Sequence, residues 1–117
     1  MSVAKAQIRN EVLEDLAVVA AGETPSAADA SRVDSAIERL NEELVADGIS
    51  YWATSAVPDD VVEPFKALVA FRVAKAFEVD PQLRAELRSE ATPAYTRLVA
   101  LTAKRDTTGE PIRAEYF

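Results

Sequence analysis

The chain has 117 residues, of which 49% are apolar and 28% charged, and its formal net charge is −7. This length fits one domain with a modest core, and the apolar content argues against wholesale disorder. The absence of cysteine and histidine excludes disulfides, thiolate nucleophiles and the imidazole on which many catalytic and metal sites depend. A sequence pI near 4.6 argues against tight binding to a nucleic-acid backbone. No apolar run reaches the roughly 20 residues of a membrane span. Together these features predict a soluble protein made in the cytoplasm, and not an enzyme.

The first half of the sequence predicts two amphipathic helices. The first is expected from Val3 to Ala21, with Gly22 just after its end. The second is expected to open at Thr24-Pro25, as N-cap and first helical residue, and to stop at Gly48. Each carries one apolar stripe at helical spacing: Ile8, Val12, Leu16 and Val19 in the first, and Ala30, Val33, Ile37, Leu40 and Leu44 in the second.

Residues 49–57 (ISYWATSAV) break the helical period and are expected to form a connecting loop with aromatic residues. Two roles for Tyr51 and Trp52 stay open at this point. They can anchor the loop on the core of the domain, or they can form a docking surface, because Tyr and Trp contribute strongly to protein interfaces.

The second half predicts two further helices. One begins at Pro58 and runs to Phe77, with Pro64 expected in its first turn, where amides are unpaired in any case. Residues 65–77 are apolar on most faces, which predicts a central helix that seeks neighbours beyond its own bundle. The other begins at Asp80-Pro81 and ends near residue 105. Its stripe keeps phase through Pro93, which favours one helix kinked there over two separate helices: Leu83, Leu87, Ala91, Ala94, Leu98 and Leu101.

The predicted fold is therefore all-α, a four-helix bundle over residues 1–105 followed by an extended C-terminal arm over residues 106–117. The arm has turn chemistry at Gly109-Glu110-Pro111 and ends in Tyr116-Phe117. Its apolar side chains either fold back over the core of the same chain or become ordered in the groove of a partner.

Charge is divided unevenly along the chain. Residues 1–63 contain 13 acidic and 4 basic residues, a net charge of −9, whereas residues 64–117 contain 7 acidic and 9 basic residues, a net charge of +2. The split is either without consequence or describes a head-to-tail contact, in which the acidic half of one copy meets the basic half of the next.

Two rows of carboxylates have helical spacing, and we interpret both as solvated helix surface: Glu11, Glu14 and Asp15, and Asp34, Glu38 and Glu42. A carboxylate-dependent hydrolase is the enzymatic alternative. No catalytic, cofactor-binding or metal-binding residue is predicted.

Two stretches carry a resemblance to a known family. Residues 13–49 (LEDLAVVAAGETPSAADASRVDSAIERLNEELVADGI) join two helices through the turn AGETPS, and residues 57–77 (VPDDVVEPFKALVAFRVAKAF) form an alanine-rich apolar helix after Val-Pro-Asp-Asp. Together they resemble the head-to-tail connector, or adaptor, proteins of tailed bacteriophages. That group includes the tail accessory, packaged-DNA-stabilising factors of short-tailed phages.

The resemblance implies a virion protein whose identical subunits form a ring, twelvefold by expectation, beneath the portal protein. The ring would extend the DNA channel without binding DNA specifically, and would offer a platform to a downstream tail or second connector protein. It implies no cofactor and no membrane. A non-viral cytosolic helical protein–protein interaction module is the alternative.

The resemblance also suggests which residues meet partners. A C-terminal segment docks on the portal in that family, and by position and chemistry the matching residues are Ile112, Arg113, Tyr116 and Phe117. The candidates for ring or tail contacts are Tyr51, Trp52, Lys66, Arg72 and Lys75.

Overall fold

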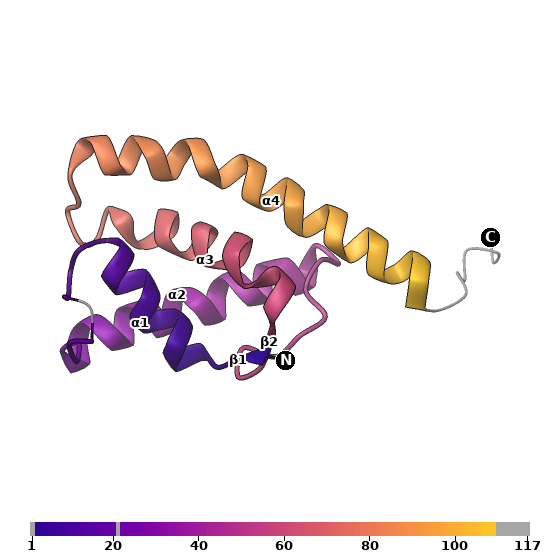
Figure 1. The fold of residues 1–117 in the computed structure, drawn as a ribbon, viewed down its shortest axis with the longest axis horizontal. Coiled ribbons are helices and arrows are strands. Elements are labelled where there is room, and N and C mark those ends of the chain that lie inside the picture. Colours follow the sequence, from indigo (N-terminus) through magenta and orange to yellow (C-terminus); the bar gives the residue numbers. More distant parts are fainter. Residues whose placement is uncertain (1, 21, 110–117) are drawn as a thin grey trace.

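The computed structural model describes residues 2–20 and 22–109, with side chains to residue 104, and confirms a mostly helical fold (Figure 1). Four helices account for most of the described chain, and a two-stranded sheet joins its start to the entry of the third helix. In chain order the elements are β1 (Ser2–Val3), α1 (Lys5–Asp15), α2 (Ala27–Ala46), β2 (Val57–Pro58), α3 (Asp59–Ala74) and α4 (Pro81–Gly109).

The helices are arranged around α3. Helices α1 and α2 pack on each other and on one side of α3, and α4 lies along its other side (Figure 1). Strands β1 and β2 pair antiparallel, with Ser2 opposite Pro58 and Val3 opposite Val57. The buried side chains of the described residues form a core cluster in which Phe65 is the largest fully buried side chain, followed by Ile8, Leu13, Ile37, Leu44 and Leu98.

Helix α2 has the predicted stripe and the predicted end, but it begins later than expected. Its N-cap is Ser26, whose hydroxyl accepts a hydrogen bond from the Asp29 amide at 3.2 Å, in place of Thr24. Gly48 follows the helix with φ of +77°, and the next amide, that of Ile49, bonds the Leu44 carbonyl at 2.8 Å. This is the glycine-terminated helix end that the sequence predicted.

Helix α1 is shorter than predicted. It ends at Asp15, and the chain turns at Ala17, which has φ of +62°, while the Val18 amide bonds the Leu13 carbonyl at 3.0 Å. The same kind of helix end therefore forms here without glycine. Leu16 is still buried and Val19 half-buried, because the turn keeps them against the core.

Helix α3 begins after Pro58 as predicted, but Pro64 is its sixth residue and does not lie in the first turn. Proline has no N–H, so the carbonyl of the exposed residue Asp60 has no helical partner at this point. The helix is central, as expected, and the rest of the chain covers most of its apolar residues, while contacts beyond its own bundle stay a prediction. Seven of its residues are buried by the rest of the chain, and Phe71 is its exposed large apolar side chain among the described residues.

Helix α4 is continuous through Pro93, which settles the choice between one helix and two. It continues to Gly109, so residues 106–109 are helical and the expectation of extended chain there is wrong. Residues 110–117 lie outside the described residues, and with them the predicted portal contacts Ile112, Arg113, Tyr116 and Phe117.

Candidate functional site

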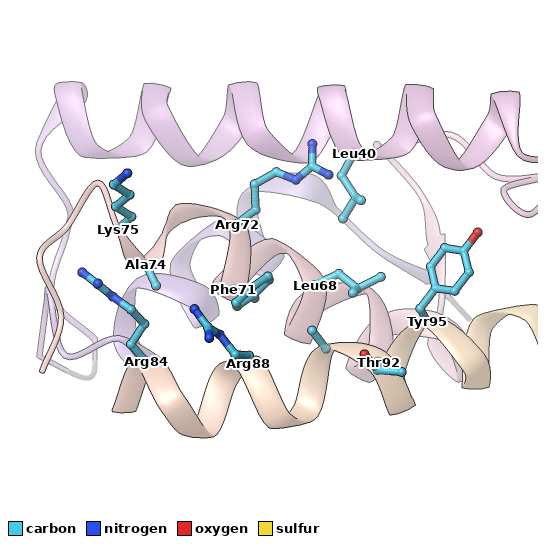
Figure 2. Close-up of a pocket in the computed structure, with 11 residues that line it drawn as sticks. Leu40, Leu68, Phe71, Arg72, Ala74, Lys75, Arg84, Arg88, Thr92 and Tyr95 are labelled. Carbon is cyan, nitrogen blue, oxygen red and sulfur yellow. The ribbon is translucent and has the colours of Figure 1, made fainter. Parts of the chain in front are cut away.

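A groove of about 730 Å³ lies where α2, α3 and α4 come together (Figure 2). Apolar side chains from α3, including Leu68 and Phe71, line its middle, and basic side chains from α3 and α4 stand on both sides of them. We call this surface the basic groove. Its lining consists of Leu40, Leu68, Phe71, Arg72, Ala74, Lys75, Arg84, Arg88, Ala91, Thr92 and Tyr95.

Among the residues that the structure describes, the lining of the basic groove includes four cations and no carboxylate, although acidic residues outnumber basic ones in the chain by 20 to 13. One of these cations is already neutralised. Arg72 donates two hydrogen bonds to Glu43 on α2, at 2.7 and 2.8 Å, and this pairing holds the pKa of Glu43 below its ordinary value. Lys75, Arg84 and Arg88 form no ion pair with any residue that the structure describes.

Two hydrogen bonds tie α4 to the carboxyl end of α2 beside the groove. The Tyr95 hydroxyl donates to Asp47 Oδ2 at 3.2 Å, and the Thr102 hydroxyl donates to the Ile49 carbonyl at 2.8 Å. Tyr95 is 39% exposed and Phe71 is 38% exposed, so the groove presents two aromatic rings at the surface. The groove therefore combines accessible apolar surface with unpaired positive charge.

Lys66, a candidate for ring or tail contacts, holds α1 against α3 within the protomer. Its ammonium lies 3.0 Å from Glu11, 3.4 Å from Glu63 and 3.7 Å from Asp15, and its side chain is only 14% exposed. Burial alone would lower the pKa of Lys66, but the hydrogen bond to Glu11 and the neighbouring carboxylates outweigh it, so the pKa is raised. The positive charge of Lys66 is therefore paired with carboxylates of the same protomer.

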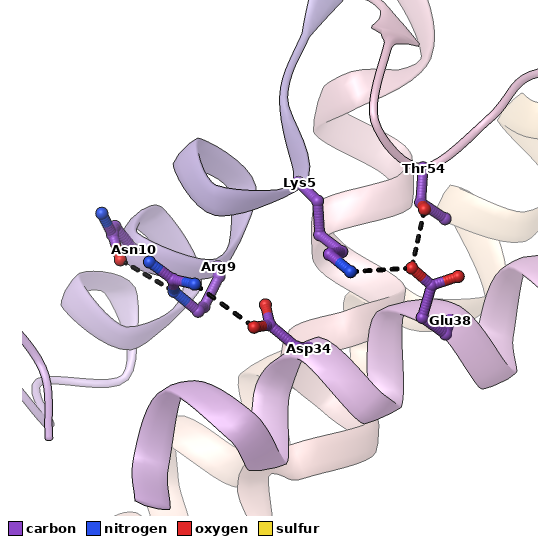
Figure 3. Close-up of polar contacts among 6 residues, drawn as sticks. All are labelled: Lys5, Arg9, Asn10, Asp34, Glu38 and Thr54. Atoms are coloured by element: carbon purple, nitrogen blue, oxygen red, sulfur yellow. Dashed lines mark hydrogen bonds and ion pairs between the residues drawn. The ribbon is translucent and has the colours of Figure 1, made fainter. Parts of the chain in front are cut away.

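A second set of polar contacts joins α1 to α2 and to the aromatic loop (Figure 3). Lys5 donates to Glu38 at 2.9 Å, Thr54 donates to the same carboxylate oxygen at 2.8 Å, and Arg9 pairs with Asp34 at 3.2 Å. The hydrogen bonds from Lys5 and Thr54 lower the pKa of Glu38. Asp34 and Glu38 are thus structural ion-pair partners, which corrects their interpretation as purely solvated surface.

Trp52 is 7% exposed and packs edge-to-face against Phe65, with ring centroids 6.0 Å apart, and against Tyr51, at 5.0 Å. Asn41, buried on α2, fixes the same loop. Its amide donates to the Trp52 carbonyl at 3.4 Å, and its carbonyl oxygen accepts from Ser50 at 2.7 Å. Of the two roles left open for this pair, the structure places Trp52 as a loop anchor, while Tyr51 keeps an exposed ring.

The predicted interface residues therefore do not form one surface. Arg72 and Lys75 line the basic groove. Lys66 is paired with carboxylates of the same protomer, and Trp52 is buried in its core. Sequence reasoning missed Arg84 and Arg88. Their signal was present as two arginines one turn apart near the start of a helix, a position where cations are disfavoured.

Comparisons with family models, with curated proteins and with solved structures found no match. Within the described residues, no helix is long and apolar enough to cross a membrane, and no group of three or more acidic side chains could hold a metal ion.

Proposed function

We propose that the protein is a structural head-to-tail connector of a tailed phage virion. In this proposal identical copies form a ring beneath the portal protein, extend the DNA channel and present a platform to the tail. The proposal rests on the resemblance carried by residues 13–49 and 57–77, together with a four-helix fold of the kind that the resemblance implies.

The observation that supports it best is the position of α4. This 29-residue helix lies along α3, and its end at Gly109 projects beyond the other three helices (Figure 1). A helix rises about 1.5 Å per residue, so α4 is roughly 40 Å long. The end of α4 therefore lies at the edge of the protomer. A C-terminal segment that docks on a larger assembly would need to start at such a place.

The charge distribution supports a ring through fewer residues than the charge difference between the two halves of the sequence suggested. Lys66 and Arg72 pair with acidic residues of α1 and α2 in the same protomer, so part of the asymmetry serves folding. A head-to-tail contact would instead depend on the unpaired cations of α3 and α4. The net charge of −7 suits a channel wall along which DNA slides, because the wall repels phosphate.

The experiment is to mix the full chain with the portal protein of its own phage and to image the mixture by electron microscopy. A ring seated beneath the portal is the expected result. A variant lacking Tyr116 and Phe117 should keep its helical content by circular dichroism and lose portal attachment. Absence of any portal complex with the full chain would overturn the proposal.

The second candidate is a non-viral helical interaction module. The basic groove favours it, because this surface is complete within a single protomer. A protein that never binds the portal, yet binds a partner through the groove, would belong to this class.

A further inference from the structure

We propose that the basic groove binds a peptide segment of a partner protein that carries several carboxylates and at least one aromatic or aliphatic side chain. The proposal does not rest on the connector function, since the groove is built within one protomer. Charge, helix energetics and shape support it separately.

The first argument is charge complementarity. Lys75, which follows the last residue of α3, and Arg84 and Arg88 on α4 line one groove, and none of them has an ion-pair partner among the described residues (Figure 2). No carboxylate from the described part of the chain lines the groove, in a protein whose net charge is −7. An acidic ligand would supply the missing counter-charge, which favours partner choice and association rate.

The second argument is that Arg84 and Arg88 disfavour the helix on which they lie. They are one turn apart, which places like charges side by side, and Arg84, the fourth residue of α4, lies near the positive end of the helix dipole. Asp80, four residues before Arg84, caps α4 through the Gln82 amide and offsets part of this charge. Arg88 has no acidic residue three or four positions away in either direction. The two arginines thus destabilise α4 locally and form no ion pair with the described residues that would offset this effect. Residues that disfavour their own helix in this way are typical of a binding surface.

The third argument is the shape and lining of the groove. Its volume of about 730 Å³ falls within the range of ligand sites, and the partly exposed ring of Phe71 lies between Arg72 and Arg88, with Leu68 beside it toward Tyr95 (Figure 2). An apolar side chain of the ligand can cover this strip while flanking carboxylates meet the cations. A nucleic-acid backbone would instead need a longer basic track, and the overall negative charge would oppose it.

The test is an amide chemical-shift titration by NMR of the full chain. The probe is a synthetic peptide, Glu-Glu-Phe-Glu-Leu-Glu, with blocked ends. One control peptide has glutamine in place of every glutamate, and another has alanine in place of phenylalanine and leucine. We expect saturable shifts at Phe71, Ala74 and Ala91 with the first peptide, and much weaker shifts with either control.

The variants are chosen to separate the groove from general charge effects. Arg88→Glu should weaken binding of the probe by about tenfold or more. Arg97→Glu is the matched control, because it makes the same charge change on the same helix but on its opposite side, outside the groove. It should change affinity by less than about twofold, as expected for an exposed charge.

Three results would overturn the proposal. They are the absence of saturable shifts at groove residues up to millimolar peptide, equal losses in Arg88→Glu and Arg97→Glu, and tighter binding of an oligothymidylate than of the peptide at the same residues. Because the portal protein is absent from this titration, these results leave portal attachment untested, and failure of the groove proposal is therefore distinguishable from failure of portal binding. Circular dichroism of both variants checks that they fold.

Discussion

Replacing Trp52 tests whether the aromatic loop is part of the core. The indole is almost completely buried, contacts Phe65 edge-to-face and lies in a loop that Asn41 holds by two hydrogen bonds. Truncating a buried tryptophan to alanine costs about 3–5 kcal/mol, and an aromatic pair adds about 1 kcal/mol. Because a domain of this size has a free energy of unfolding of about 5–15 kcal/mol, Trp52→Ala should remove a large part of it.

Trp52→Phe is the matched variant, and it should be far milder. It keeps an aromatic ring against Phe65 and removes the indole Nε1–H, which is buried without a hydrogen-bond partner among the described residues. Loss of an unpaired buried donor is favourable by about 1–3 kcal/mol and offsets much of the smaller ring's lost packing. Urea unfolding followed by far-UV circular dichroism measures both variants. A change below about 1 kcal/mol for Trp52→Ala would refute the anchor role and favour an interface role for Trp52.

Two further predictions concern the turn after α1 and the response to acid. Ala17→Gly should raise the free energy of unfolding by about 0.5–1 kcal/mol, because Ala17 has positive φ and glycine adopts positive φ without steric cost. Ala20→Gly is the control. Equal effects of the two substitutions in thermal unfolding would contradict the role given to the positive φ of Ala17. The pKa values of Glu11, Glu38 and Glu43 are lowered from 4.5 by hydrogen bonds, led by those from Gln7, Lys5 and Arg72 respectively. Their contribution to stability is present above pH 4.5 and is lost as pH falls through the lowered values, so the urea midpoint should fall between about pH 5 and pH 3. A midpoint independent of pH in that window would show that these ion pairs do not stabilise the fold.

The contrast between α1 and α2 shows which features of the fold the sequence could predict. Helix α2 has a regular apolar stripe and a glycine where its end requires positive φ, so both its packing and its end were predictable. Helix α1 ends through the same geometry at Ala17, a residue that ordinarily avoids it. Tertiary packing of Leu16 and Val18 against the core outweighs that local preference. The sequence therefore did not indicate the end of α1 at Asp15. Gly22, five residues after Ala17, instead suggested that the helix continues to Ala21.

The ion pairs of two interface candidates within the protomer were hidden for a related reason. Lys66 and Arg72 were singled out as cations on an apolar helix, but the sequence could not show that Glu11 and Glu43 would meet them across the bundle. The basic groove was missed because its cations come from two helices whose facing arrangement is a tertiary property. Only the four-residue spacing of Arg84 and Arg88 was visible beforehand.

The way α4 is attached has a mechanical consequence. Helices α1, α2 and α3 all pack on one another, whereas α4 packs chiefly on α3, and Tyr95 and Thr102 reach the end of α2. One wall of the basic groove thus belongs to the framework of α1, α2 and α3, and the other belongs to α4, which is held by its extensive packing on α3 and by these two hydrogen bonds. A ligand that contacts both Lys75 and Arg88 would add a further link between the end of α3 and α4.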